Sequence, residues 1–436
     1  MVNNDAFAWT PSKELVASSN LTAFLMAAGE SSYETLVRHA DRDPAWLMDQ
    51  VFRFCDVRFY RPYDTMLDLS AGLAHARWCI GGTTNLVLNC IDKHRGTPVW
   101  EQTFMVWEGE NPEESRTISY RELDQGVCRL AAALRSLGIG VGDVVALYMP
   151  NIPEAFVAFF ATLKLGAILM PLFSGFGPDP IMTRLRHGEA KVVLTSDGTW
   201  RRGKPEPLKS VLDKALEQAP TVRHVVVVRR MGMELDAPMQ RGRDLWYDEL
   251  IADQAPDFET VEMPAEAPAI LLYTSGTTGK PKGCIWTHIG FLGAMVTRDI
   301  RICGDFRPSD RFFFMSDMGW MVGAMCACIP SSAGASLLIA EGIPDFPDRG
   351  RFWRLVQDHS VTYLGVSPTL VRGLMRHGDA DVEQYDLSAL RMTCSGGEAW
   401  TEPAWRWFFK HVCKERLPII NICRAKSRYG SGHRRY

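Results

Sequence analysis

Short apolar segments alternate with longer amphipathic segments over most of this sequence. Residues 121–137 carry apolar side chains at close to a 3.6-residue period, which predicts a helix that ends at Gly138. The apolar run at 144–149 then predicts a strand, and another helix is predicted after Asn151. Because strands that alternate with helices usually pair in parallel, the sequence predicts an α/β fold with helices on both faces of its sheets.

The other predicted elements follow the same alternation. Strands are predicted at 167–172, 191–195, 269–273, 311–315, 335–339, 361–366 and 390–394, and helices at 288–300, 351–359 and 369–377. A polar stretch at 229–264, rich in Met, Asp, Glu and Pro, predicts a boundary between two α/β subdomains. We therefore predict an aromatic-rich cap over residues 1–84, a first subdomain over 85–264 and a second over 265–422.

Charge and cysteine content restrict the class of protein. The formal net charge of -3 over 436 residues argues against a general nucleic-acid binder, because such proteins usually present a basic surface. Eleven cysteines without a repeating spacing are typical of reduced thiols in a cytoplasmic protein.

The apolar segment 155–173 is nearly long enough to span a bilayer. Lys164 within it would be costly in lipid, and Gly166 and Pro171 divide the segment. The sequence therefore predicts a buried helix followed by a strand instead of a membrane span.

Residues 273–283 constrain the chemistry. They read Tyr-Thr-Ser-Gly-Thr-Thr-Gly-Lys-Pro-Lys-Gly and continue the apolar run that begins at Ala269, so a buried strand opens into a loop of glycines, hydroxyls and lysines. Glycine lets backbone N–H groups turn toward an anion, hydroxyls add donors and lysine adds positive charge, which together predict a phosphate-binding loop. A Walker loop is excluded, because only two residues separate Gly276 from Gly279 and Pro281 follows Lys280.

The segment 273–283 resembles the phosphate-binding signature of the adenylate-forming enzymes, which include acyl-CoA synthetases, luciferases and the adenylation domains of peptide synthetases. Other segments extend the resemblance in the family's order, from 116–197 to Cys394-Ser395-Gly396-Gly397-Glu398-Ala399. Over residues 5–422 the chain is similar to AMP-forming acyl-CoA synthetases of the acetyl-CoA synthetase-like branch. The resemblance implies the large N-terminal α/β domain of that fold, with two doubly wound sheets and flanking helices.

The resemblance also implies a role for each of several segments. It assigns ATP binding to Thr274, Ser275, Gly276, Thr277, Thr278, Gly279, Lys280 and Lys282, with Thr274 and Lys282 as candidate catalytic residues, and adenine contact to Gly397, Glu398 and Ala399. It assigns the acyl-pocket wall to Trp320, Met321, Val322 and Gly323, and the CoA phosphates to Arg201 and Lys204. Ala399 departs from the branch, which usually has proline there. No metal-ligating residue is predicted.

The implied reaction uses a small carboxylate, ATP with Mg²⁺, and coenzyme A. The carboxylate attacks the α-phosphate of ATP to give an acyl-adenylate and pyrophosphate, and the CoA thiol then displaces AMP. Both steps develop negative charge on oxygen, so fixed N–H donors, lysines and Mg²⁺ are suitable catalysts. Acetate, propionate, acetoacetate and longer acyl chains all stay open as substrates, and so does the oligomeric state.

The resemblance ends after Ile422. Residues 423–436 include five Lys or Arg and no acidic residue, and nothing in the sequence matches the family's C-terminal domain or the end of its N-terminal domain, which includes part of a β-barrel. We therefore expect a truncated synthetase of weak or absent activity, whose basic tail is either aberrant, as after a frameshift, or genuine. Two alternatives stay open: a non-enzymatic nucleotide- or CoA-binding remnant, and the adenylation domain of another adenylate-forming enzyme.

Overall fold

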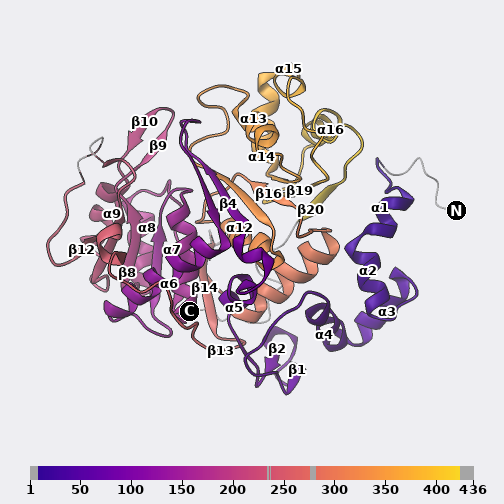
Figure 1. The fold of residues 1–436 in the computed structure, drawn as a ribbon, viewed down its shortest axis with the longest axis horizontal. Coiled ribbons are helices and arrows are strands. Elements are labelled where there is room, and N and C mark those ends of the chain that lie inside the picture. The colour runs from indigo at the N-terminus through magenta and orange to yellow at the C-terminus, as the bar shows by residue number, and fades with distance from the viewer. Residues whose placement is uncertain (1–7, 233–234, 236, 275–280, 423–436) are drawn as a thin grey trace.

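The fold is built on two seven-stranded sheets, shown in a computed structural model that describes residues 8–232, 235, 237–274 and 281–422 (Figure 1). Two segments of the sequence predictions, 275–280 of the phosphate loop and the tail 423–436, lie outside the described residues. The first sheet has the order β12-β11-β8-β6-β7-β14-β15. Its strands are β6 (Val144–Tyr148), β7 (Ile168–Pro171), β8 (Val192–Ser196), β11 (His224–Val228), β12 (Asp244–Trp246), β14 (Pro268–Thr274) and β15 (Lys282–Thr287).

The second sheet has the order β20-β19-β18-β16-β17-β4-β5. Its strands are β4 (Thr103–Glu108), β5 (Ser115–Ser119), β16 (Arg311–Phe314), β17 (Ser336–Ala340), β18 (Tyr363–Val366), β19 (Met392–Gly396) and β20 (Ile419–Ile422). In each sheet all neighbours are parallel except one antiparallel pair at an edge, β14–β15 in the first and β4–β5 in the second. The predicted α/β class with two doubly wound sheets is therefore confirmed.

Three apolar clusters divide the molecule into layers, because alternate residues of a strand face opposite sides of its sheet. In β6, Val145 and Leu147 belong to the central cluster, whereas Ala146 and Tyr148 belong to the cluster outside the first sheet. In β17, Leu338 likewise faces the cluster outside the second sheet. The order is therefore helices, sheet, helices, sheet, helices.

The helices of the three layers share these clusters. The central layer contains α5 (Leu86–Cys90), α6 (Tyr120–Ser136), α7 (Pro153–Lys164), α12 (Met321–Ala333) and the π-helix η6 (Phe291–Cys303), which follows the short α11 (His288–Gly290). Outside the first sheet lie α8 (Pro178–His187) and α9 (Leu208–Leu216). Outside the second sheet lie α13 (Arg351–Asp358), α14 (Pro368–Leu374), α15 (Ala380–Glu383) and α16 (Glu402–His411). Helix α10 (Tyr247–Ile251) follows β12 and contacts α6.

Four helices begin the described chain and group at one side of the molecule, away from β9 and β10 (Figure 1). They are α1 (Lys13–Ser18), α2 (Asn20–Ala27), α3 (Tyr33–Arg42) and α4 (Pro44–Phe54), and α2 and α4 pack on η6. Three two-stranded sheets complete the fold: β1 (Thr65–Asp68) with β2 (Arg77–Ile80), β3 (Thr83–Thr84) with β13 (Met263–Pro264), and β9 (Thr199–Arg201) with β10 (Lys204–Glu206). Short 3-10 turns are η2 (Leu73–His75), η3 (Asp92–His94), η4 (Pro98–Glu101) and η7 (Met375–His377).

Helix α7 shows how the apolar segment 155–173 is accommodated. Every residue of α7 except Glu154 is buried, and Lys164 at its end is fully buried too. Lys164 Nζ lies 2.9 Å from Asp92 Oδ1 and donates to Thr260 Oγ1 at 2.8 Å, so its charge is compensated inside the protein. Gly166 then turns the chain into β7. Among the described helices, none combines the length and apolar character that a bilayer crossing requires.

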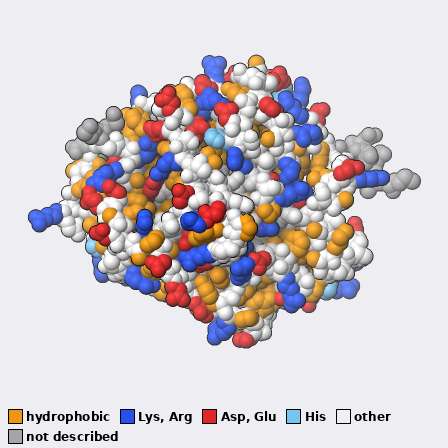
Figure 2. Space-filling model, viewed as in Figure 1, with side chains coloured by type: hydrophobic (Ala, Val, Ile, Leu, Met, Phe, Trp, Pro, Cys, Tyr) orange, Lys and Arg blue, Asp and Glu red, His pale blue; other side chains and the backbone are white. Residues whose placement is uncertain are grey.

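The sheets do not follow the predicted division of the sequence at residue 264. Strands β14 and β15 come after that position but belong to the first sheet, whereas β4 and β5 come before it and belong to the second. The chain therefore crosses between the sheets in both directions, which joins them through a common core. On the face seen in Figure 2, acidic and basic side chains are interspersed, in keeping with a net charge of -3.

Candidate functional site

The two described ends of the phosphate loop are cross-strand neighbours. Thr274 ends β14 and Lys282 begins β15, and their Cα atoms are directly opposed in the antiparallel register. Side chains at opposed positions project from the same face of a sheet, so the Thr274 hydroxyl and the exposed Lys282 ammonium can act on one anion. Ser275, Gly276, Thr277, Thr278, Gly279 and Lys280 lie outside the described residues.

Tyr273 fixes the strand just before the loop. Its hydroxyl lies 2.7 Å from His187 Nδ1 at the end of α8, and the Arg184 guanidinium stands 5.6 Å from the centre of its ring. Burial raises the pKa of Tyr273 to about 12, so the phenol is neutral at physiological pH. These contacts lie on the opposite face of β14 from Thr274, and they hold the strand end without occupying the face that Thr274 and Lys282 share.

The predicted acyl-pocket wall lies beside Thr274. Trp320 is 45% exposed and caps α12, and its ring centre is 5.6 Å from that of Phe173. Met321 and Val322 are half-buried and Gly323 is buried in the first turn of α12. A cavity of about 20 Å³, enough for about one water, is bounded by Leu272, Tyr273, Thr274, Cys284, Trp286, Gly319, Trp320 and Met321.

A larger cavity of about 200 Å³ lies where the carboxyl ends of both sheets meet. Its lining comes from the segments that follow β6, β7 and β8 in the first sheet and β16, β17 and β18 in the second, and includes Asn151, Ser174, Arg201, Ser316, Asp317 and Gly342. Open α/β sheets bind ligands at this end of their strands. Residues 315–321 border both cavities, so one segment separates the phosphate-loop side from the Arg201 side.

Arg201 and Lys204 are also cross-strand partners. They face each other in the β9–β10 hairpin, and Arg201 lines the larger cavity. The two side chains therefore project from one face of the hairpin, as binding of a single phosphate group by both would require. Arg201 Nε lies 3.6 Å from Glu206 Oε2 on the same hairpin.

The segment predicted to contact adenine follows β19 and is exposed. Gly397 has a φ of +102°, which is a conformation that favours glycine. The Glu398 carboxylate accepts hydrogen bonds from Thr369 and, at 3.1 Å, from Arg372 Nη2, both on α14. The bond from Thr369 is the main cause that lowers the pKa of Glu398. The Glu398 side chain is thus turned to α14, and Gly397, Glu398 and Ala399 are exposed residues.

Sequence reasoning missed Asp317, which joins the two sheets at the site. Its carboxylate accepts hydrogen bonds from Ser174 Oγ at 2.5 Å and from the backbone N–H of Gly319 at 2.7 Å. Burial raises the pKa of Asp317, and the hydrogen bond from Ser174 opposes that rise. Asp317 stands two residues before the predicted Gly-Trp pair, but its partner Ser174 is 143 positions away. Local sequence gives no signal for such a contact.

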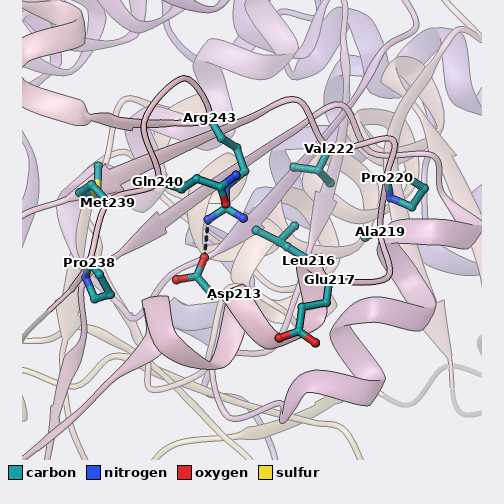
Figure 3. Close-up of a pocket in the computed structure, with 10 residues that line it drawn as sticks. All are labelled: Asp213, Leu216, Glu217, Ala219, Pro220, Val222, Pro238, Met239, Gln240 and Arg243. Atoms are coloured by element: carbon teal, nitrogen blue, oxygen red, sulfur yellow. Dashed lines mark hydrogen bonds and ion pairs between the residues drawn. The ribbon is translucent and has the colours of Figure 1, made fainter.

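Two other features lie apart from this arrangement. Within the described ranges, no group of three or more His, Cys, Asp and Glu side chains is placed to hold a metal ion. A cavity of about 590 Å³ lies between α9 and residues 238–243 (Figure 3). Its Arg243 already pairs with Asp213 at 2.5 Å, and the described residues that line it include none of the predicted site residues.

The fold and the two strands that flank the phosphate loop define a class of protein. Comparison with models of known protein families identifies that class. A family model described as "AMP-binding enzyme" matches residues 93–422, which is more than half of the chain. A second model, described as "Acetyl-coenzyme A synthetase N-terminus", matches residues 33–90. The chain therefore belongs to the AMP-binding enzyme family.

Individual proteins show which members of this family the chain resembles. An acetyl-coenzyme A synthetase of Rhodopirellula baltica is 38% identical over 413 residues, covering 93% of this chain and 60% of that protein. An acetyl-coenzyme A synthetase 2 of Pseudomonas putida is 39% identical over 393 residues, covering 89% and 60%. The solved structure of acetoacetyl-CoA synthetase from Streptomyces lividans matches with a TM-score of 0.86 at 27% identity, covering 95% of this chain and 64% of that one. The chain spans 60% of the length of the curated relatives it matches.

Proposed function

We propose that this chain provides the ATP-, acyl- and CoA-binding surfaces of an AMP-forming acyl-CoA synthetase that acts on a short-chain carboxylate. One observation carries the proposal: the opposed Thr274 and Lys282, the Trp320 wall and the Arg201 hairpin gather around the carboxyl ends of the two sheets. The similarity to acetyl-CoA synthetases over 93% of the chain supports the same class of reaction.

The nucleotide would lie along the carboxyl ends of β14 and β19. Thr274 and Lys282, together with the loop 275–280, would bind its β- and γ-phosphates, and the exposed residues Gly397, Glu398 and Ala399 would contact adenine. Lys282 is suited to this role because an ammonium group adds a strong charge-assisted hydrogen bond to phosphate. Mg²⁺ usually binds with the substrate phosphates and needs only one or two carboxylates from the protein, and no step is assigned to it here.

The acyl group would lie between Thr274 and the Trp320 wall. The similarity to acetyl-CoA synthetases supports a short acyl chain at this position. In the first step a carboxylate oxygen attacks the α-phosphorus, and the bond from that phosphorus to the pyrophosphate oxygen breaks. In the second step the CoA sulfur attacks the acyl carbonyl, the bond to AMP breaks, and the thiol proton passes to solvent. The protein's part is to position the reactants and stabilise anionic oxygens.

Carboxylate-dependent exchange of labelled pyrophosphate into ATP tests this function. The assay uses the full chain with acetate, propionate, acetoacetate and a longer fatty acid, each against a blank without carboxylate. Weak exchange above the blank is expected with a short acid. ATP binding without exchange for any acid would contradict the synthetase proposal and favour a nucleotide-binding protein without ligase activity.

Lys282→Ala tests the phosphate-binding assignment by itself. Loss of a charge-assisted hydrogen bond to phosphate costs about 1.5–3 kcal/mol, so the Kd for ATP should rise by about ten- to a hundredfold. Isothermal titration calorimetry measures the change. Lys214→Ala is the matched control, because Lys214 is exposed on α9 outside the first sheet, and its Kd should stay at the value of the unaltered chain. An unchanged Kd in Lys282→Ala would remove Lys282 from the site.

A further inference from the structure

The β9–β10 hairpin that carries Arg201 and Lys204 is held by a carboxylate in the turn that follows β4 of the second sheet. Glu110, which is 2% exposed, accepts hydrogen bonds from the backbone N–H groups of Arg202 at 2.9 Å and Gly203 at 2.8 Å. These two residues form the hairpin turn and have φ values of +52° and +68°. One carboxylate therefore binds both amides of a turn whose conformation is unusual for Arg202.

A second buried carboxylate holds the start of the hairpin. Glu341, which follows β17 and is 1% exposed, accepts hydrogen bonds from Thr199 Oγ1 at 2.8 Å and Arg230 Nε at 2.8 Å. Burial raises the pKa of Glu341, and Arg230 opposes that rise. The hairpin is thus fixed at both its base and its turn by side chains of the other sheet.

Arg351 in turn fixes the backbone next to both carboxylates. It is fully buried in α13, and its Nη2 donates to the carbonyl oxygens of Gly109 and Glu341, each at 2.7 Å. Gly342 allows the close approach, because a Cβ at this position would lie 2.5 Å from Glu110 Oε1. The positions of Glu110 and Glu341 are therefore set by the core of the second sheet.

The hairpin needs such anchors, because strands of three residues in an isolated two-stranded sheet are not stable in water. The Glu110 carboxylate accepts its hydrogen bonds from backbone amides of the hairpin turn. The nearby cationic side chains of Arg201 and Lys204 therefore stay available to bind a ligand. Among the described residues, Arg201 forms one ion pair, with Glu206, and Lys204 forms none. The anchors order the hairpin before any ligand arrives, which removes an ordering cost from binding.

We propose that Glu110 is a positioning residue for CoA: by fixing the turn at Arg202 and Gly203, it holds Arg201 and Lys204 in the orientation that receives the CoA phosphates. This inference rests on the proposed function, since it takes CoA as the ligand of the hairpin. A positioning role for Glu110 and a purely electrostatic role predict opposite changes in CoA affinity when Glu110 is removed. A negative charge near a phosphate site repels the ligand, so if Glu110 acted only through its charge, removing it would strengthen CoA binding.

The test compares Glu110→Ala with Glu113→Ala in the full chain. Glu113 is exposed three residues away and its removal changes the net charge equally. In Glu110→Ala, we expect hydrogen exchange of the Arg202 and Gly203 amides to accelerate by more than tenfold, the Kd for CoA to rise by about tenfold and the Kd for ATP to stay within about twofold. Glu113→Ala should change none of the three quantities.

Each other outcome has a defined meaning. Unchanged exchange, or CoA affinity that is equal or higher in Glu110→Ala, would overturn the positioning role while leaving the proposed function intact. Equal losses of CoA and ATP affinity would show a general structural defect and also overturn it. If the unaltered chain binds ATP but no CoA, the CoA step of the proposed function is wrong and the inference fails with it. If circular dichroism shows that Glu110→Ala does not fold, Glu110→Gln, which keeps one acceptor, decides by the same measurements.

Discussion

The two large sheets have the same plan, six parallel strands and one antiparallel edge strand, but they contribute to the site differently. In the first sheet the antiparallel edge carries candidate site residues, because β15 starts at the carboxyl end of β14 and brings Lys282 opposite Thr274. In the second sheet the antiparallel strand β5 leads into α6, and the candidate residues follow inner parallel strands. Trp320 follows β16, and Gly397 follows β19.

This difference separates two ways of presenting groups to a ligand. Parallel strands deliver loops to one end of a sheet, where backbone groups and single side chains accumulate. An antiparallel hairpin adds two opposed side chains at fixed spacing, which suits a charged group that needs two partners. The pair Thr274 and Lys282 and the pair Arg201 and Lys204 both follow the second pattern, and both are assigned to phosphates.

Gly319→Ala should break the contact between the sheets and have the largest effect. A Cβ at Gly319 would overlap the backbone N and Cα of Phe173, which cannot move as the end of a flexible side chain can. We expect a loss of about 3 kcal/mol in the free energy of unfolding, measured by urea denaturation. Gly373→Ala on α14 is the control, since a Cβ there meets nothing within 4 Å, and its change should stay within about 1 kcal/mol. Equal stability of both variants would mean that the sheets do not meet at Gly319.

His288→Asn tests how the chain is held just after β15, at the end of this strand that lies away from Lys282. His288 follows β15, is fully buried, and its Nδ1 accepts the Leu86 N–H at 3.2 Å. Burial lowers the pKa of His288 to about 3. Below the unfolded pKa of about 6.5 the unfolded chain binds the extra proton, so stability is lost as pH falls from 6.5 toward 3. Between pH 7 and pH 5 this contribution is about 2 kcal/mol.

The expected result is therefore a change in pH dependence. The unfolding free energy of His288→Asn should fall by about 2 kcal/mol less than that of the unaltered chain between pH 7 and pH 5. Asn keeps an oxygen that can accept the Leu86 N–H but does not titrate in this range. His75→Gln, at an exposed position, should leave the pH dependence as it is. Parallel pH profiles for His288→Asn and the unaltered chain would show that His288 protonates equally in both states.

The sequence predicted local patterns well and long-range contacts not at all. The 3.6-residue period over 121–137 became α6 at Tyr120–Ser136, and the apolar run before the phosphate loop became β14. By contrast, the sequence does not predict α12, because the resemblance assigns residues 320–323 only to a pocket wall. The strands β4 and β5 were also missed. The division at 264 follows composition, whereas the sheets are set by pairing between distant strands.

The same distinction applies to the candidate site. The sequence assigns Arg201 and Lys204 through the family resemblance, and both residues lie within four positions of one local segment. Glu110 and Asp317 are invisible there, because their hydrogen-bond partners are 92 and 143 positions away. Their acidic side chains act on backbone and hydroxyl groups, which carry no distinctive sequence pattern. Residues that hold a site in place are therefore harder to find than residues that face its ligand.

Ser174→Ala should have the smallest effect, because it removes one of the bonds that join the carboxyl ends of β7 and β16. The lost bond runs from Ser174 Oγ to Asp317 at 2.5 Å, whereas the Ser174 backbone N–H stays 3.3 Å from the same carboxylate. A hydrogen bond to a charged group contributes about 1.5 kcal/mol, so we expect a loss of that size in the free energy of unfolding at pH 7. Ser31→Ala, at an exposed position, is the control.

The pH dependence of this loss identifies its cause. Burial raises the pKa of Asp317, and the Ser174 hydroxyl opposes the rise by stabilising the charged carboxylate. As pH falls through the folded pKa of Asp317, the carboxyl becomes neutral and the hydroxyl loses its charged acceptor. The difference between Ser174→Ala and the unaltered chain should therefore shrink on acidification, as measured by urea unfolding at a series of pH values. A difference that stays constant with pH would assign the loss to packing of Ser174 and not to its hydrogen bond with Asp317.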